Sequence, residues 1–183
     1  MHQLNSNAEL EIIQHCQKGS LKAQEQLYKR FYGYAMGVSL RYSISRDDAL
    51  EVVNDAFIKV FNTITTYNTE RPFKAWLRRV VINTAIDRRR KDLKYQLHTD
   101  IEDAGHIGHT HTAVDALNAQ DILKMMKTLP AVQRAIFNLY EIDGYNHDEI
   151  AIMLSIPASS SRVYLSRAKE KLRKALNIEI LKP

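Results

Sequence analysis

One segment of the chain places an amide side chain between arginines, at the spacing of a single helix face. Arg79, Asn83, Asp87 and Arg90 follow one another at intervals of four, four and three residues. Because an α-helix turns once in about 3.6 residues, these four side chains would share one side. Asparagine can read the edge of a base, and arginine can hold the neighbouring phosphates. The pattern indicates a surface that binds nucleic acid.

The charge around this amide is strongly positive. Residues 71–91 contain eight basic side chains and one acid, Asp87. A buried helix could not carry so many charges, so one face must be exposed. A solvated helix end, whose cations favour the helix dipole, would explain residues 88–91. It does not explain the basic residues at the start of the segment, which are Arg71, Lys74, Arg78 and Arg79.

The segment before it has the opposite charge. Residues 47–57 contain four acids and no base, and Asp48, Glu51 and Asp55 align on the side away from the apolar residues. An acidic face cannot serve DNA, so it either binds a protein with basic residues or is simply solvated. The residues alone favour solvation.

A third candidate is the stretch "NHDEIAIMLSIPASSSRVYLSRAKEKL", residues 146–172. Asn146 and Glu149 have the spacing of a capping box, in which each side chain satisfies a free amide of the other residue. Two apolar-spaced helices joined by a short turn are typical of a helix-turn-helix unit, whose second helix enters the DNA major groove. A plain helical hairpin with a basic face would look similar. The outward positions of the second helix are Ser160, Arg162, Val163, Ser166, Arg167 and Lys169.

The elements that must position these residues are all helical. Six glycines and four prolines in 183 residues, with no alternating apolar pattern, predict an all-α fold. Residues 96–117 lack any sustained helical period and predict a flexible linker between two small domains, 1–95 and 118–183, the second a helix-turn-helix domain. The helices are expected at residues 8–16, 21–34, 47–64, 72–91, 119–127, 131–142, 148–154 and 159–176.

Composition excludes several classes of protein. A net charge of +5 and a pI near 9.3 favour an acidic partner such as nucleic acid. The single cysteine, Cys16, excludes an internal disulfide framework and fits a reducing compartment. There is neither a run of apolar residues long enough to span a membrane nor a signal peptide, so we expect a cytoplasmic protein without membrane insertion.

The sequence gives little sign of chemistry beyond binding. It contains no recognisable nucleophile and base pair and no phosphate-binding glycine loop, so we expect no enzymatic activity and no cofactor. His106, His109 and His111 could hold zinc, but they lie in the expected linker with no cysteine nearby. An incidental histidine-rich tract is therefore favoured over a metal site.

Taken in order, four segments resemble the extracytoplasmic-function sigma factors of bacteria, which belong to the sigma-70 family. The segments are "DDALEVVNDAFIKVFNTI", "FKAWLRRVVINTAIDRRRK", "LPAVQRAIFNLYEIDGYNHDEIAIML" and "SRAKEKLRKAL". The resemblance runs from about Leu10 to Leu176. It implies two helical domains, called regions 2 and 4, and the function of an alternative sigma factor.

The resemblance also implies roles for the surfaces. The acidic segment would dock on the β′ clamp helices of core RNA polymerase, and region 4 would contact the β flap and the −35 element. The segment from Thr69 onward would melt the −10 element and capture a flipped base. The protein would be a monomer when free and would be held inactive by an anti-sigma factor. The residues implied in docking are Asp48, Glu51, Asp55 and Phe57, and those implied at the −10 element are Thr69, Glu70, Arg71, Lys74, Arg79, Asn83 and Arg90.

Some residues depart from the family pattern. Ser155 stands where a glycine commonly follows the first helix of the helix-turn-helix, so this turn residue is either strained or differently shaped. Ser161 stands where an apolar residue is common. A helix-turn-helix repressor or activator with a dimerising or ligand-binding first domain is the alternative, but it has no use for a second basic helix after an acidic one.

Overall fold

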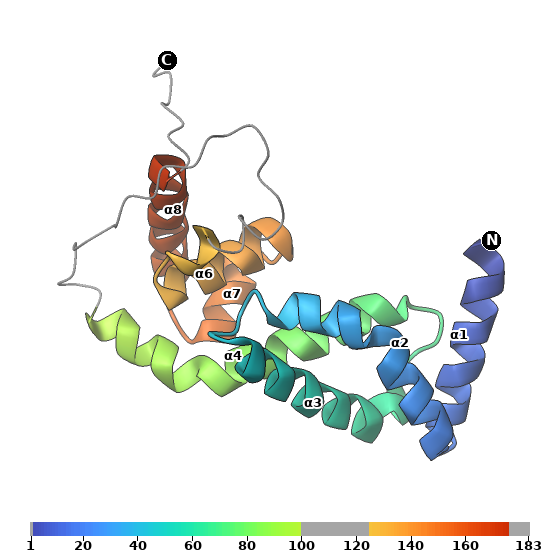
Figure 1. Cartoon of the computed structure of the whole chain (residues 1–183). Coiled ribbons are helices and arrows are strands. Elements are labelled where there is room, and N and C mark those ends of the chain that lie inside the picture. Colours follow the sequence, from blue (N-terminus) through green and yellow to red (C-terminus); the bar gives the residue numbers. More distant parts are fainter. Residues whose placement is uncertain (1, 100–124, 176–183) are drawn as a thin grey trace. The chain divides into compact units, whose positions relative to one another are not determined.

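The computed structural model describes residues 2–99 and 125–175, with side chains for residues 8–90 and 125–174. This part of the chain is helical and contains no strand, which confirms the all-α fold. The chain divides into two units, Met1–Arg88 and Arg89–Pro183 (Figure 1). Most of the expected linker lies outside the described residues, so the domain boundaries at 95 and 118 stay a prediction. Within the described ranges, no helix is long and apolar enough to cross a membrane.

The first unit begins with three helices whose ends are set by local signals. Gly19, with a φ of +82°, ends the first helix, because glycine takes this left-handed conformation without strain. Ser20 and Ser45 cap the next two helices through their side-chain oxygens. The elements of this unit are α1 (His2–Gln17), α2 (Leu21–Ser39), α3 (Arg46–Thr63), the short 3₁₀ helix η1 (Ile64–Thr66) and the start of α4 (Phe73–Thr99).

Helix α2 continues well past its expected end at residue 34. Gly33 and Gly37 weaken the helical signal of this stretch. Ala35, Met36 and Val38 are nevertheless buried, so tertiary packing holds the helix where local propensity would not. Cys16 is also buried, which raises the pKa of its thiol to about 11 and leaves the group protonated.

The core of the first unit joins α2, α3 and α4. The predicted apolar stripe of α3 is buried from Ala49 to Val60. Phe73 at the start of α4 packs on Phe31 of α2, with ring centroids 4.8 Å apart, and contacts Tyr67 and Trp76. This aromatic cluster fixes the loop between η1 and α4.

The second unit contains a π-turn where the sequence predicts an uninterrupted helix. Residues 131–142 form α6 (Ala131–Phe137) followed by η3 (Asn138–Ile142), a π-helical turn. The amide of Asp143 donates to the carbonyl of Asn138, 2.9 Å away, which is the spacing of a π-helix. The helix-turn-helix follows as α7 (His147–Leu154) and α8 (Ala158–Ala175).

The predicted capping box at the start of α7 is confirmed. The side-chain oxygen of Asn146 accepts hydrogen bonds from the amides of Asp148 and Glu149, both 2.9 Å away. The carboxylate of Glu149 accepts the amide of Asn146 at 2.8 Å. At the other end of α7, Ser155 has a φ of 55° and a ψ of 49°, so this residue is in the left-handed region and the turn keeps the glycine-like shape.

This strain at Ser155 gives a direct prediction. Replacing Ser155 by glycine should stabilise the second unit by about 0.5 to 1 kcal/mol, because the steric cost of the left-handed conformation exceeds the added freedom of the unfolded chain. Urea unfolding of the full chain followed by circular dichroism would measure it. Ser166→Gly, at an exposed position inside α8, is the control and should be destabilising. Equal effects at both positions would contradict the prediction.

Candidate functional site

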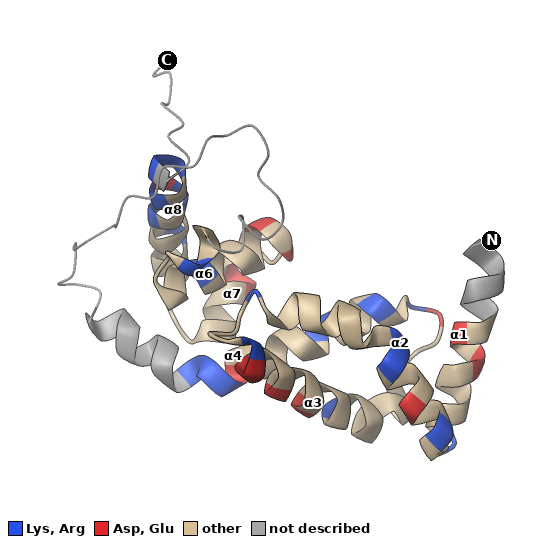
Figure 2. Cartoon of the chain, in the orientation of Figure 1, with Lys and Arg blue, Asp and Glu red and all other residues tan. Residues whose placement is uncertain are grey.

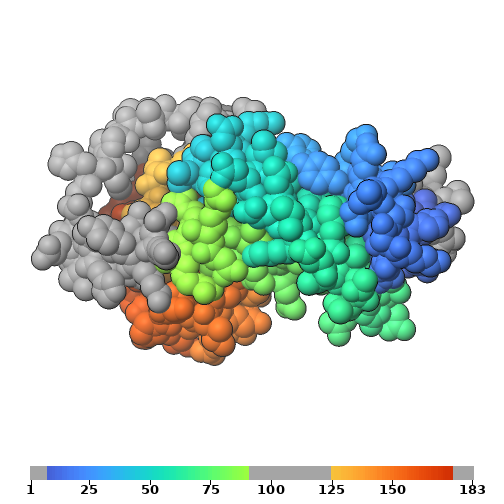
Figure 3. All heavy atoms as spheres, turned by 90° about the horizontal axis from the view of Figure 1, so that it is seen from below, coloured from blue at the N-terminus to red at the C-terminus, as the bar shows by residue number. Residues whose placement is uncertain are grey.

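The acidic face of α3 is bound by one arginine from α4. The Nε atom of Arg88 lies 3.3 Å from Oδ1 of Asp48, and its Nη1 atom lies 3.3 Å from Oδ2 of Asp55. Its Nη2 atom is paired with Oε2 of Glu51. Figure 2 shows the acidic positions of α3 near the basic part of α4, and Figure 3 shows the two helices adjoining on the surface. One guanidinium therefore ties together the three predicted acids.

This cluster was not predicted, although the sequence contains a signal for it. Leu77, Val81 and Ala85 are spaced four residues apart on α4, and all three are buried. Arg88 lies three residues after Ala85, so it falls on the same side of the helix and points toward α3. The cluster does not cancel the charge, because three carboxylates face one guanidinium. Glu51 and Asp55 remain 58% and 50% exposed and available to a basic partner.

Phe57 must be removed from the predicted docking residues. Its side chain is only 2% exposed, and its ring packs on Tyr28 at 4.8 Å and on Phe61 at 5.8 Å. It belongs to the apolar stripe of α3, so a partner could reach it only by opening the core.

The loop before α4 and the first turn of α4 hold four of the predicted −10 residues around a hollow. Asn68 shapes the loop, since its side-chain oxygen accepts the amide of Glu70 at 2.9 Å. The hydroxyl of Tyr67 donates to the carbonyl of Arg71 and closes the loop across four residues. The hollow has a volume of about 380 Å³, which is in the range of small-ligand pockets. Its lining includes Thr69, Glu70, Arg71 and Lys74.

The other predicted −10 residues lie apart from this hollow. Three residues of the set, Arg79, Asn83 and Arg90, are exposed on α4 and do not line the hollow. The first two are four residues apart on one helix, so they share a face. The predicted set therefore forms two neighbouring surfaces, a hollow at the start of α4 and an exposed face further along it.

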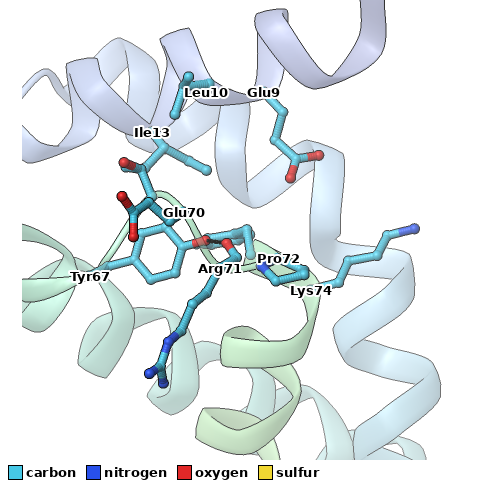
Figure 4. A pocket seen from close by; sticks show the side chains of 10 residues that line it. Glu9, Leu10, Ile13, Tyr67, Glu70, Arg71, Pro72 and Lys74 are labelled. Atoms are coloured by element: carbon cyan, nitrogen blue, oxygen red, sulfur yellow. Dashed lines mark hydrogen bonds between the residues drawn. The ribbon is translucent and has the colours of Figure 1, made fainter. Parts of the chain in front are cut away.

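A third part of this region, helix α1, was missed by the sequence analysis. Glu9, Leu10 and Ile13 line the hollow opposite the loop (Figure 4). Gln17 donates through Nε2 to the carbonyls of Ile64 and Tyr67, at 3.0 and 3.1 Å. No local pattern could have indicated these contacts, because they join residues about 50 positions apart.

The outward face of α8 largely matches its prediction. Arg162, Val163, Ser166 and Arg167 are exposed, and Val163 is 49% exposed despite being apolar. Ser160 is half-buried. Lys169 is already paired, since its Nζ atom lies 2.6 Å from Oε1 of Glu141. Figure 2 shows how many positions of this helix are basic.

The helix-turn-helix has a polar contact inside it. Ser161 of α8 is fully buried, and its hydroxyl lies 2.9 Å from Nδ1 of His147 at the start of α7. The His147 ring stacks on Tyr140 of η3, with centroids 4.5 Å apart. Burial lowers the pKa of His147, and Arg162 and Lys169 add to this while Asp148 opposes it. One imidazole thus connects three elements of the unit.

The histidine tract at residues 106, 109 and 111 lies outside the described residues. Among the residues that the structure does describe, no group of three or more histidine, cysteine or acidic side chains could hold a metal ion.

Two family models match the chain. Sigma-70 region 2 matches residues 27–94, and sigma-70 region 4 matches residues 119–172. Together they cover more than half of the chain, in the order of the two units.

Individual relatives agree with these matches along nearly the whole chain. The ECF RNA polymerase sigma-E factor of Haemophilus influenzae is 27% identical over 173 residues, covering 88% of this chain and 91% of the relative. The sigma-E factor of Escherichia coli K12 is 24% identical, with 88% and 90% covered. The sigma factor RpoE of Bartonella quintana, solved with the anti-sigma factor NepR, has a similar fold, with a TM-score of 0.53 and 20% identity over 87% of this chain and 99% of that one.

The His147 contact predicts how the stability of the second unit depends on pH. A pKa lowered by folding means that the unfolded chain binds a proton more readily than the folded one. Stability should therefore fall as the pH drops through about 6.5, the ordinary value for histidine. Circular dichroism melts between pH 7.5 and 5.5 would measure this loss. It should shrink in His147→Gln and persist in His15→Gln, which changes an exposed histidine of the first unit. An unchanged pH dependence in His147→Gln would refute this.

Proposed function

This chain belongs to the sigma-70 family, in its extracytoplasmic-function group, and from that premise we propose how its surfaces divide the work of an alternative sigma factor. The acidic face of α3 docks on core RNA polymerase. The hollow and the exposed face of α4 engage the −10 element, and α8 reads the −35 element. The observation that carries the proposal is that an anionic surface and a cationic, amide-bearing surface occupy adjacent helices of region 2.

Docking on α3 follows from charge complementarity. The three carboxylates keep a net negative charge after pairing with Arg88, and two of them are at least half exposed. In the family, the corresponding helix meets the β′ clamp helices of the polymerase. A basic side chain of the partner would share or replace Arg88 on the carboxylates, so docking and the α3 to α4 contact would compete for the same acceptors.

This competition allows a sharp test of docking. A triple variant, Asp48→Asn, Glu51→Gln and Asp55→Asn, removes the charges but keeps the side-chain shapes. It should reduce co-purification with core polymerase by about tenfold, since several surface ion pairs of up to about 1 kcal/mol each are lost.

Arg88→Gln is the matched control, because it breaks the same internal ion pairs and leaves the acids in place. It should bind polymerase at least as well as the wild type. If both variants lose binding equally, the acids act only by holding α4, and the docking role is wrong.

Recognition of the −10 element follows from the two surfaces at the start of α4 and along it. A melted strand exposes base edges and faces that are hidden in the duplex. The hollow beside Thr69, Glu70 and Arg71 is large enough to take an unstacked base. Asn83 is exposed four residues after Arg79, so an amide that can read a base edge lies beside a cation that can hold phosphate.

Substitution of Asn83 should therefore impair promoter opening more than it impairs binding to duplex DNA. In Asn83→Ala we expect promoter opening by the holoenzyme to fall about tenfold, the equivalent of one lost base contact. Closed-complex binding at low temperature should change less than about twofold. Opening can be followed with a fluorescent base in the −10 region of a promoter recovered by run-off transcription from genomic fragments. Asn62→Ala, at an exposed position of α3, is the control. Equal losses in opening and binding would contradict base capture.

Recognition of the −35 element rests on the exposed face of α8. Arg162 and Arg167 can pair with guanine or phosphate, and Val163 offers an apolar contact for a thymine methyl group. Lys169 is held by Glu141, which makes it a weaker candidate for a base contact. Two weak DNA sites joined in one chain raise each other's effective concentration, so neither unit needs high affinity alone.

The remaining parts of the proposal follow from the family. Solved relatives include RpoE with the anti-sigma factor NepR and CnrH with the cytosolic domain of CnrY. We extend such a partner to this chain, together with a contact to the β flap, a monomeric free state, a cytoplasmic location and no catalytic activity or cofactor of its own. A helix-turn-helix repressor or activator, the alternative function, would need neither the acidic face of α3 nor the hollow.

A further inference from the structure

Helix α1 forms one side of the hollow before α4, but the proposed docking and DNA-binding surfaces do not include it. The match to sigma-70 region 2 begins at residue 27, so it leaves α1 out. In the structure, Glu9, Leu10 and Ile13 of α1 face the loop of residues 67–72 across the hollow (Figure 4). Leu10 and Ile13 supply an apolar wall, and Glu9 supplies a carboxylate.

Gln17 links α1 to the loop on the other side of the hollow. Its amide donates to the carbonyls of Ile64 and Tyr67, which stand at the end of α3 and at the entry of the loop. The carbonyl of Ile64 also accepts the amide of Tyr67 at 3.1 Å, so Gln17 adds a second donor there and joins the end of α3 to the loop. Since Tyr67 also closes the loop through its hydroxyl, Gln17 positions the whole loop relative to α1.

The polar groups of the hollow favour hydrogen-bond donors. Figure 4 shows the carboxylate of Glu9 extending from α1 toward the loop, while the charged ends of Arg71 and Lys74 extend away from it. Lys74 lies over the ring of Tyr34, with Nζ 5.6 Å from its centroid. Glu9 is weakly paired, at 3.7 Å from Nε of Arg30, so it can still accept a further hydrogen bond. A ligand in the hollow would thus meet acceptors on the α1 side.

We propose that α1 is half of the base-capturing pocket, with Gln17 positioning the loop and Glu9 selecting a base that carries an exocyclic amino group. This inference rests on the proposed function, since it concerns the base captured from the −10 element. Adenine, cytosine and guanine each present an amino group that can donate to a carboxylate, whereas the one ring N–H of thymine lies between two carbonyl oxygens that would repel the carboxylate. Thymine should therefore be the poorest base at the captured position.

The test uses holoenzyme made from core polymerase and the full chain. On a promoter recovered by run-off transcription, each base pair of the −10 region is changed to the other three, and transcript yield is measured. With the wild type, one position should lose about tenfold with thymine relative to the best amino base, as expected for one lost base contact. Glu9→Gln can donate as well as accept, so it should reduce this difference to about twofold while other positions keep their preferences.

Two controls separate selection from structure. Glu11→Gln changes a neighbouring exposed carboxylate of α1 and should keep the discrimination against thymine. Arg30→Gln breaks the ion pair of Glu9 but leaves its carboxylate, and should also keep it. Unchanged base preferences in Glu9→Gln would overturn the role of Glu9. Absence of transcription with the wild type would instead overturn the proposed function, and this inference with it.

The positioning role of Gln17 has its own readout. Gln17→Leu should lower transcript yield about tenfold on every promoter version, because the loop loses its anchor. Co-purification with core polymerase should be unchanged. Gln14→Leu, at an exposed position of α1, is the control and should behave as the wild type. If Gln17→Leu transcribes normally, or loses polymerase binding to the same extent, α1 does not position the loop.

Discussion

The pairing of Arg88 with three carboxylates is the interaction that lets two oppositely charged surfaces stand on adjacent helices of the first unit. It joins α3 to α4 three residues after the buried Ala85. Opposite charges can stand on adjacent helices because this one cation bridges them, and the excess negative charge still faces solvent. The buried residues Leu77, Val81 and Ala85 hold the orientation of α4, and with it the side of the helix on which Asn83 is exposed. A surface for a basic protein and a surface for an acidic strand are therefore held in one rigid relation.

The sequence was most informative where a structure depends on neighbouring residues. The stripe of α3 from Ala49 to Val60 and the capping box of Asn146 and Glu149 were both readable from spacing, because the contacts repeat every turn or close within three residues. The order of the charged segments was also visible. These local features were enough to identify the fold class and to indicate the family.

Features that depend on distant residues could not be read in this way. Helix α2 runs past two glycines because Ala35, Met36 and Val38 are buried, and burial is decided by other helices. The π-turn of η3 has no local signature in this chain. The resemblance included Phe57 among the docking residues, although its spacing with the other apolar residues of α3 places it on the buried side. The wall that α1 gives to the hollow depends on Gln17 reaching residues 64 and 67.

The contact of His147 with the buried Ser161 has a consequence for how the sequence of this chain can change over evolution. A serine without its imidazole, or an imidazole without its serine, would leave a polar group unmet between α7 and α8. An apolar pair would fill the same space without needing either. A single substitution at either position thus lowers the stability of the second unit, while a double replacement by apolar residues does not. The two positions should therefore covary among related sequences of this domain.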